Sequence, residues 1–180
     1  MARIPLPTRD DLPNDELKDR WDRTAQRGPV LNIQRAFFTN PGIETNAFKV
    51  WKASGLSPRA RELVILRCAV ARGSSYEWHQ HVRIARNEGL SDEDILAVKT
   101  WEPSERFSND ERALLAYVDD LAAAQRASDD VFNAFAAERT PGEVFGVTYL
   151  ITMYFQLAQV MATLDLETED PFVGWDLQGA

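Results

Sequence analysis

The sequence predicts an all-α fold, organised as a single-domain bundle of about seven to eight helices. Ser, Thr, Pro and Gly divide the 180 residues into pieces of helix length. Almost no segment alternates apolar and polar residues with the period of two that is typical of a half-buried strand. The chain is 44% hydrophobic and has one cysteine, so it can bury a core without disulfides.

The N-terminal part of the sequence predicts three helices. We expect the first from Pro13 to about Gln26, a short one from Ile33 to Thr39, and a third from Pro41 to Ser54 that is closed by Gly55. Without a Gly/Ser linker, a low-complexity tract or a repeat, one domain over residues 1–180 is the simplest organisation.

Within this domain, residues 1–47 are expected to form an N-terminal helical extension, and residues 48–98 a helical hairpin with the helix that follows it. The hairpin carries the clearest helix-boundary signals in the chain. The first hairpin helix begins at the N-cap Ser57 with Pro58 and ends before Gly73, and the second begins at the N-cap Ser75 and ends before Gly89.

Capping boxes open three of the later helices. In each, a hydroxyl side chain precedes an acid by three residues: Ser91 with Asp94, Ser108 with Glu111, and Thr140 with Glu143. Including one helix that starts after Ser128, we expect helices over about residues 92–100, 109–126, 129–138 and 141–164.

Residues 144–164 carry no charge, and this uncharged segment is long enough to span a membrane. Several Gln and Thr residues interrupt the segment, and no Lys or Arg follows Arg139 to anchor it at a membrane surface. We therefore predict no membrane association and interpret the segment as a buried central helix with surface left for a subunit interface.

The overall charge limits the partners that the chain can bind. The formal charge is -8 and the basic residues are scattered, so the sequence offers no footprint for a phosphate backbone and predicts no nucleic-acid binding. Residues 1–10 contain two prolines and no apolar stretch typical of a secretory signal, which favours a cytoplasmic location.

Two helices present polar residues on apolar faces. At about 100° per residue, His81 lies within an apolar arc beside Glu77, one turn earlier, whereas His79 lies on the charged side. On the preceding helix Glu62 lies among apolar residues, and Gly73 turns one helix back on the other. Glu62, Glu77 and His81 could therefore converge in a partly buried cluster suited to proton transfer. Arg67 could hold a substrate carboxylate or neutralise one of these acids.

The segment Leu56–Arg67, followed by Tyr76-Glu77-Trp78-His79-Gln80-His81, resembles the carboxymuconolactone decarboxylase superfamily, which includes the alkylhydroperoxidase-D-like proteins. The match covers about residues 48–98, and residues 107–115 also resemble longer members. The redox-active branch has a Cys-x-x-Cys pair, and Ser74 and Glu77 occupy those positions here. A thiol peroxidase is therefore disfavoured, and Cys68 is interpreted as a buried thiol.

The resemblance to the decarboxylase branch implies a lyase of aromatic-compound catabolism that needs no cofactor or metal. Its substrate would be a small acidic lactone or keto acid, changed by decarboxylation, isomerisation or hydrolysis. His81 would be the acid/base, with Glu77 or Glu62 as its orienting partner. We add Arg67, Tyr76 and Ser74 as candidate substrate-binding residues. The family is typically trimeric or hexameric, so a homo-oligomer is expected.

Two readings without catalysis remain open. Glu77 and His81 could be a helix-start acid and a core histidine, in a helical binding or scaffold protein that kept the fold after losing the thiols. Metal ligation by His81 and Glu77 is disfavoured, since His79 lies on the opposite face and no third ligand has the right spacing.

Overall fold

The structure is a computed structural model that describes residues 2–43, 47–170 and 172. Within that part it contains nine α-helices, one short 3-10 helix and no strand, which confirms the predicted all-α class. The chain divides into two compact units. One combines described residues of 1–46 with those of 160–173, and the other comprises residues 47–159.

The first unit contains helices α1 (Asp15–Ala25) and α2 (Asn32–Thr39). The side chain of Asn14 caps α1 by accepting a hydrogen bond from the Leu17 amide at 3.0 Å. The buried core of this unit is small and consists of Leu12, Leu17 and Phe38, with Trp21 and Val30 packed against it.

The N-terminal residues are held by the segment that follows the last helix. The Arg3 amide donates to the Leu164 carbonyl at 2.9 Å, and the Asn32 amide donates to Glu169 Oε1 at 2.7 Å. The sequence predicted a single domain in which residues 1–47 are an extension. In the structure, this region also hydrogen-bonds to the segment that follows α9, a contact that local sequence patterns could not indicate.

The second unit contains all the motif residues. Its elements are α3 (Ala47–Ala53), α4 (Pro58–Arg72), α5 (Ser75–Asn87), α6 (Asp92–Ala97), the 3-10 helix η1 (Val98–Thr100), α7 (Asn109–Ala123), α8 (Asp129–Ala136) and the part of α9 (Pro141–Thr163) up to Gln159.

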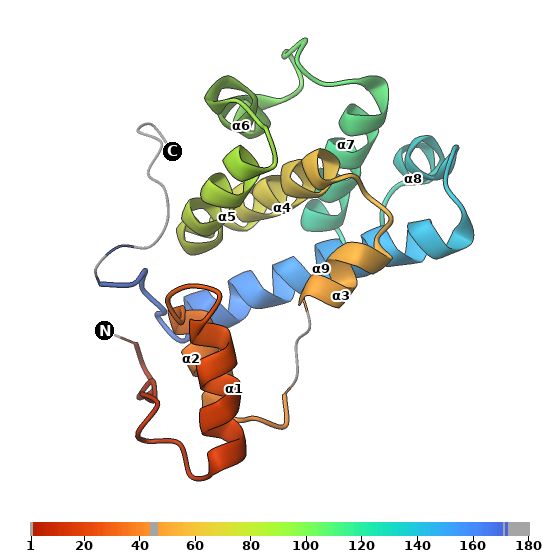
Figure 1. Ribbon diagram of the computed structural model, residues 1–180. Helices are drawn as coiled ribbons and strands as arrows, with labels where there is room; N and C mark the ends of the chain where they lie inside the picture. The colour runs from red at the N-terminus through yellow and green to blue at the C-terminus, as the bar shows by residue number, and fades with distance from the viewer. Residues whose placement is uncertain (1, 44–46, 171, 173–180) are drawn as a thin grey trace. The chain divides into compact units, whose positions relative to one another are not determined.

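Helix α4 is the central helix of the second unit. It packs against α5 and α7, and the ribbon shows it between these two helices (Figure 1). Leu63, Val64, Ile65 and Leu66 are almost completely buried because α4 supplies residues to both hydrophobic clusters of this unit. A helix that is apolar on nearly every side is stable only in such a position.

The hairpin signals in the sequence correspond closely to the structure. Ser57 caps α4 by accepting from the Ala60 amide at 3.2 Å, and Gly73 ends the helix in the left-handed region at φ 61°. One detail was wrong: Ser74, not Ser75, is the N-cap of α5, and its hydroxyl accepts from the Glu77 amide at 3.4 Å. The two adjacent serines offer the same capping chemistry, so the sequence could not choose between them.

Three other predicted boundaries differ from the structure. The third helix begins at Ala47, because Pro41 and Gly42 form a turn; residues 44–46 lie outside the described part. The helix expected over 92–100 ends as an α-helix at Ala97 and continues as η1, and α7 ends at Ala123 rather than near residue 126.

Helix α9 is only partly the buried helix that the sequence predicted. Val147, Leu150 and Ile151 are fully buried, but Phe145 is 71% and Tyr149 is 52% exposed. By length and composition, α9 is the one helix in the described part of the chain that could cross a membrane, although half of its most apolar stretch is buried. An uncharged segment does not reveal which of its faces is covered.

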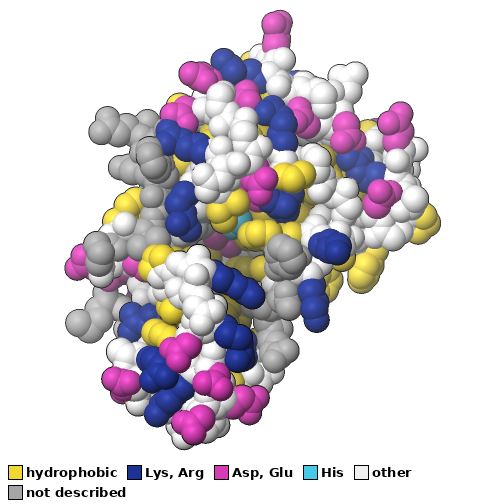
Figure 2. Space-filling model, in the orientation of Figure 1, with side chains coloured by type: hydrophobic (Ala, Val, Ile, Leu, Met, Phe, Trp, Pro, Cys, Tyr) yellow, Lys and Arg dark blue, Asp and Glu magenta, His cyan; other side chains and the backbone are white. Residues whose placement is uncertain are grey.

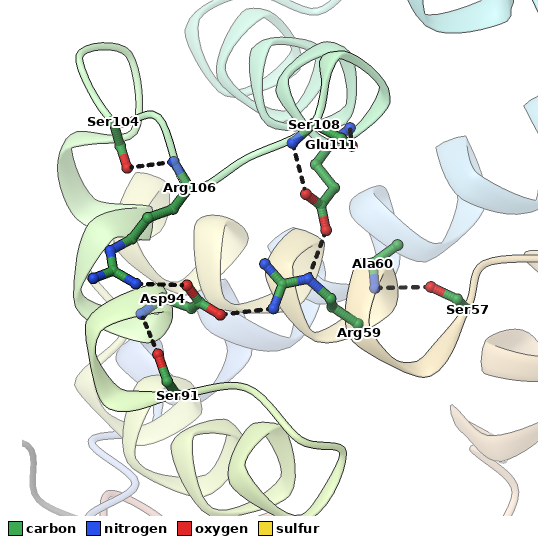
Figure 3. A network of polar contacts seen from close by, with 9 residues as sticks. All are labelled: Ser57, Arg59, Ala60, Ser91, Asp94, Ser104, Arg106, Ser108 and Glu111. Atoms are coloured by element: carbon green, nitrogen blue, oxygen red, sulfur yellow. Dashed lines mark hydrogen bonds and ion pairs between the residues drawn. The ribbon is translucent and has the colours of Figure 1, made fainter.

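Ion pairs fasten the ends of α4, α6 and α7. Arg59 donates to Asp94 and to Glu111, both at 2.7 Å, and Arg106 donates to Asp94 at 3.2 Å (Figure 3). The other oxygen of Glu111 accepts from the Ser108 amide at 2.9 Å, which completes a predicted capping box. On the face shown in Figure 2, basic and acidic side chains are interspersed rather than gathered by sign.

Candidate functional site

The turn at Gly73 brings Glu62 of α4 against His81 of α5. Glu62 Oε2 lies 2.8 Å from His81 Nδ1, and both side chains are buried. The other Glu62 oxygen accepts from Arg61 Nε at 2.8 Å. Glu62 is therefore held on both sides at the centre of the cluster.

The charge state of Glu62 follows from these contacts. Burial raises the pKa of its carboxyl, but His81 and Arg61 together outweigh burial and leave the pKa below its usual value. Glu62 is thus an ionised carboxylate, which can accept but cannot donate a hydrogen bond. The proton in the contact belongs to His81 Nδ1, and Nε2 remains to exchange a proton with a ligand.

Glu77 lies one turn before His81 on α5 and is only 4% exposed. Neither of its carboxyl oxygens makes a hydrogen bond of normal geometry with a described residue, although the Ser74 hydroxyl is near enough to affect its charge. Burial raises the pKa of Glu77 to about 8, with the Ser74 hydroxyl opposing the shift. At neutral pH Glu77 is mostly a neutral acid with one donor and free acceptor capacity, an arrangement that is costly unless a ligand uses it.

Two aromatic side chains line the cluster. Trp51 of α3 donates from Nε1 to the Tyr154 hydroxyl of α9 at 2.9 Å. The imidazole of His81 has its ring centre 6.0 Å from that of Trp51 and 5.2 Å from that of Tyr154, both edge to face. The Arg61 guanidinium lies 4.8 Å from the Trp51 ring centre.

Cys68 is completely buried on α4. Burial, and then the charge of Glu77, raise the pKa of its thiol well above the usual value. A thiolate is the nucleophile in thiol chemistry, so this environment disfavours redox activity at Cys68.

The predicted substrate-binding residues are placed differently from the acids. Arg67 does not reach Glu62, Glu77 or His81. Its Nε and Nη2 donate to Asp119 at 2.5 and 2.9 Å, and its Nη1 donates to the carbonyls of Val98 and Lys99. These contacts pair Arg67 with Asp119 rather than with Glu62 or Glu77, and its donors join α4 to α7 and η1.

Ser74 and Tyr76 lie at the start of α5. Ser74 is the N-cap of α5, and its hydroxyl accepts a hydrogen bond from the Glu77 amide. Tyr76 is buried. His79 is half-buried, outside the pair formed by His81 and Glu62. Within the described part of the chain, no group of three His, Cys, Asp or Glu side chains is arranged to hold a metal ion.

The sequence analysis assigned no place in this cluster to Arg61, Trp51 or Tyr154. Arg61 directly precedes Glu62, but adjacent helical residues do not normally share a face, so no pattern pointed to it. Trp51 and Tyr154 are 103 residues apart. Only the packing of α3 and α9 shows that they belong to the same cluster as His81.

Part of the chain is similar to a known protein family. Residues 42–120 match the model of the carboxymuconolactone decarboxylase family. A crystal structure of a protein of unknown function from Agrobacterium tumefaciens, for which the role of an AhpD antioxidant defence protein has been suggested, is 27% identical to the chain with a TM-score of 0.63. It covers 67% of this chain, and the match covers 84% of that protein. Over residues 42–120 the chain is therefore similar to the carboxymuconolactone decarboxylase family, and the solved structures support the AhpD-like fold.

Two further structures share the fold over nearly the whole length. A peroxidase-related protein from Ralstonia eutropha with an alkylhydroperoxidase AhpD core is 18% identical with a TM-score of 0.75, covering 95% of this chain and 94% of its own. The debrominase Bmp8, in complex with 2,3,4-tribromopyrrole, is 17% identical with a TM-score of 0.76, and 94% of each chain is covered. None of the curated proteins compared with the chain matches it.

The superfamily region includes the whole hairpin but stops before α9. Glu62, Glu77 and His81 lie inside it, and Tyr154 lies outside. The fold resemblance predicted from the sequence is thereby confirmed, while members that share the fold differ in the chemistry they perform.

Proposed function

We propose that the chain is a cytoplasmic acid/base enzyme that acts on a small acidic lactone or keto acid by decarboxylation or proton transfer, without a metal or organic cofactor. The observation that carries the proposal is Glu77. A buried carboxyl with two unpartnered oxygens, beside a buried His81–Glu62 pair, is where a protein would bind and protonate a ligand.

The residues have separate roles in this proposal. Glu62 keeps His81 in one orientation by accepting the hydrogen bond from Nδ1. His81 Nε2 exchanges a proton with the substrate carbon. Neutral Glu77 donates a hydrogen bond to a substrate oxygen. This assignment makes Glu62 the orienting partner, which the sequence left open between Glu62 and Glu77.

For a decarboxylation the step is balanced as follows. The bond between the substrate carbon and its carboxylate breaks, carbon dioxide leaves, and the bonding electrons form an enolate with the neighbouring carbonyl. The His81 imidazolium then delivers its proton to that carbon. Solvent returns the proton to His81, so one proton is consumed for each carbon dioxide released. In an isomerisation, His81 would instead remove a proton from one substrate carbon and return a proton to another.

The test is a screen of acidic lactones and keto acids for ultraviolet absorbance change and carbon dioxide release. We expect His81→Gln to lower kcat by about 10²- to 10⁴-fold, as for loss of a general acid/base. His79→Gln is the matched control, two residues away and outside the pair, and should retain kcat within about twofold. Full activity of His81→Gln would overturn the proposal.

A folded wild-type protein that turns over none of these compounds would also count against it. That result would favour the alternative of a helical binding or scaffold protein. A thiol peroxidase is the weakest candidate, because Ser74 and Glu77 stand at the positions of the cysteine pair and burial keeps the Cys68 thiol protonated.

We also propose that the chain forms a homo-oligomer, a trimer or a hexamer. The exposed apolar residues Phe145 and Tyr149 of α9 support this, because such side chains are commonly covered in assemblies. Light scattering at micromolar concentration should give a mass above that of the monomer, and a monomeric mass would contradict the proposal.

A further inference from the structure

Tyr154 reaches the candidate site from α9, outside the region that matches the superfamily. Its side chain is 3% exposed, and its ring stands at 83° to the His81 ring. Nothing in the hairpin motif assigns a task to this position. The surroundings of its hydroxyl group do indicate one.

The hydrogen bond between Trp51 and Tyr154 has a fixed direction. An indole N–H can only donate, so the Tyr154 oxygen is the acceptor and its own proton is not used in this bond. The described residues give that hydroxyl no further hydrogen-bond partner. A hydroxyl that already accepts a hydrogen bond is a stronger donor, because hydrogen bonds in a chain polarise one another.

Tyr154 also remains protonated. Burial raises the pKa of its hydroxyl well above the usual value, and the nearby charge of Glu62 acts in the same direction. The Trp51 bond opposes this shift without cancelling it. The side chain is therefore a neutral O–H donor throughout the range in which the protein would work.

The donor is held in place before any ligand arrives. The Ser54 hydroxyl donates to the Trp51 carbonyl at 2.7 Å, and Arg61 stacks on the indole ring. The end of α3 also lies directly against Gly146 of α9, where a Cβ would be 2.5 Å from the Ala53 carbonyl oxygen. This close approach fixes the two helices that carry Trp51 and Tyr154, and a fixed donor loses little entropy on binding.

We propose that Tyr154 donates its hydroxyl hydrogen bond to the negative oxygen of a planar enolate- or phenolate-type ligand beside His81, and that Trp51 positions it. The ligand class rests on the proposed function, in which an enolate forms. Arg61 is committed to Glu62 and to Glu88, so it does not supply this contact. Glu77 can give one hydrogen bond to such an oxygen, and Tyr154 gives a second.

The probe for this proposal is 4-nitrophenol, because its phenolate is a stable planar oxyanion with a strong visible absorbance. Titration of the wild-type protein should show saturable binding and a lowered pKa for the bound probe. Tyr154→Phe should weaken binding of the phenolate by about 10- to 100-fold, which is the usual worth of a hydrogen bond to a charged group. It should also return the pKa of the bound probe toward its value in water.

Tyr117→Phe is the matched control. Tyr117 is another tyrosine that is 3% exposed, but its hydroxyl bonds to Thr148 at 2.9 Å, away from His81. This variant should change phenolate affinity by less than about twofold. Trp51→Phe keeps the Tyr154 hydroxyl but removes its partner, and it should give a loss between those of the two tyrosine variants.

The readouts separate this inference from the proposed function. Equal phenolate binding by wild type and Tyr154→Phe, or no binding by folded wild type, would overturn the role of Tyr154 even if His81-dependent turnover is found. Phenolate binding that depends on Tyr154, in a protein that turns over no lactone or keto acid, would support the oxyanion site and count against the enzyme. Near-ultraviolet circular dichroism of each variant verifies that the core remains folded.

Discussion

Helix α4 carries two polar clusters, one half-buried around Arg67 and one buried around Glu62, that differ in how their hydrogen bonds are satisfied. Around Arg67, every contact is internal: Asp119 accepts from the guanidinium and from Trp101 Nε1, and two backbone carbonyls take the remaining donor. Around Glu62, the same helix supports a cluster in which Glu77 has no partner for either oxygen. The first arrangement stabilises the fold, whereas the second leaves bonding capacity for a ligand at a cost to stability.

The largest expected effect is at Glu77. Its pKa is raised to about 8, so the folded state binds a proton more tightly than the unfolded chain, and wild-type stability falls as pH rises from about 4.5 to about 8. Complete ionisation costs roughly 5 kcal/mol as an upper bound, at about 1.4 kcal/mol for each unit of pKa. Glu77→Gln cannot ionise and should escape this loss.

Urea unfolding of both proteins between pH 5 and pH 9 measures the difference. The variant should match the wild type within about 1 kcal/mol at pH 5 and exceed it by up to about 5 kcal/mol at pH 9. Parallel curves across this range would mean that the Glu77 carboxyl has hydrogen-bond partners in the protein in solution. The two clusters would then not differ in how their polar groups are hydrogen-bonded.

Arg67→Met tests the satisfied cluster and should have the opposite sign. Methionine keeps much of the packing volume but leaves Asp119 with the Trp101 bond alone and removes the donor to the Val98 and Lys99 carbonyls. Loss of about 3 kcal/mol is expected when one member of a largely buried ion pair is deleted. Urea unfolding at pH 7 should show it, with Arg67→Lys retaining part of the stability; a loss below about 1 kcal/mol would contradict the stabilising role.

Gly146→Ala tests the contact between α3 and α9 that holds Trp51 beside Tyr154. The new Cβ would lie 2.5 Å from the Ala53 carbonyl oxygen and 3.0 Å from Ser54 Cα, so backbone must move, at about 2 kcal/mol. Gly142→Ala is the control on the same helix, since its Cβ would lie 3.9 Å from Thr140 Oγ1, an ordinary van der Waals distance. Thermal unfolding should separate the two variants, and equal melting temperatures would show that the close approach is easily relieved.

The contrast between the clusters also shows what the sequence could predict. Helical periodicity and the stop at Gly73 predicted the contact between Glu62 and His81, because both lie on one hairpin whose geometry is local. Arg67 was assigned to the same cluster, but its partner Asp119 is 52 residues away and no local pattern indicates it. The position of Tyr154 depends on how a whole helix packs, and the exposure of Phe145 shows that composition alone does not determine this.

The smallest expected effect compares two serine N-caps. Ser74 lies beside Glu77 at the candidate site, and Ser108 lies beside the ion pair of Arg59 and Glu111. Ser74→Ala and Ser108→Ala each remove the hydroxyl that accepts from the amide three residues on, and each should cost about 1 kcal/mol. They should differ in pH dependence. The Ser74 hydroxyl lowers the pKa of Glu77, so its removal should raise that pKa further above about 8 and move the pH at which stability stops falling to a higher value.

Ser108 caps α7 and pairs with Glu111, which is held by Arg59 rather than by the candidate site. Ser108→Ala should therefore lower stability by a similar amount while the fall between about pH 4.5 and pH 8 stays where it is in the wild type. Urea unfolding at closely spaced pH values measures both quantities in one series. If Ser108→Ala shifted the pH range in which stability falls, or if Ser74→Ala did not shift it, the fall would not come from ionisation of Glu77. An unpartnered Glu77 carboxyl would then no longer distinguish this cluster from the one around Arg67.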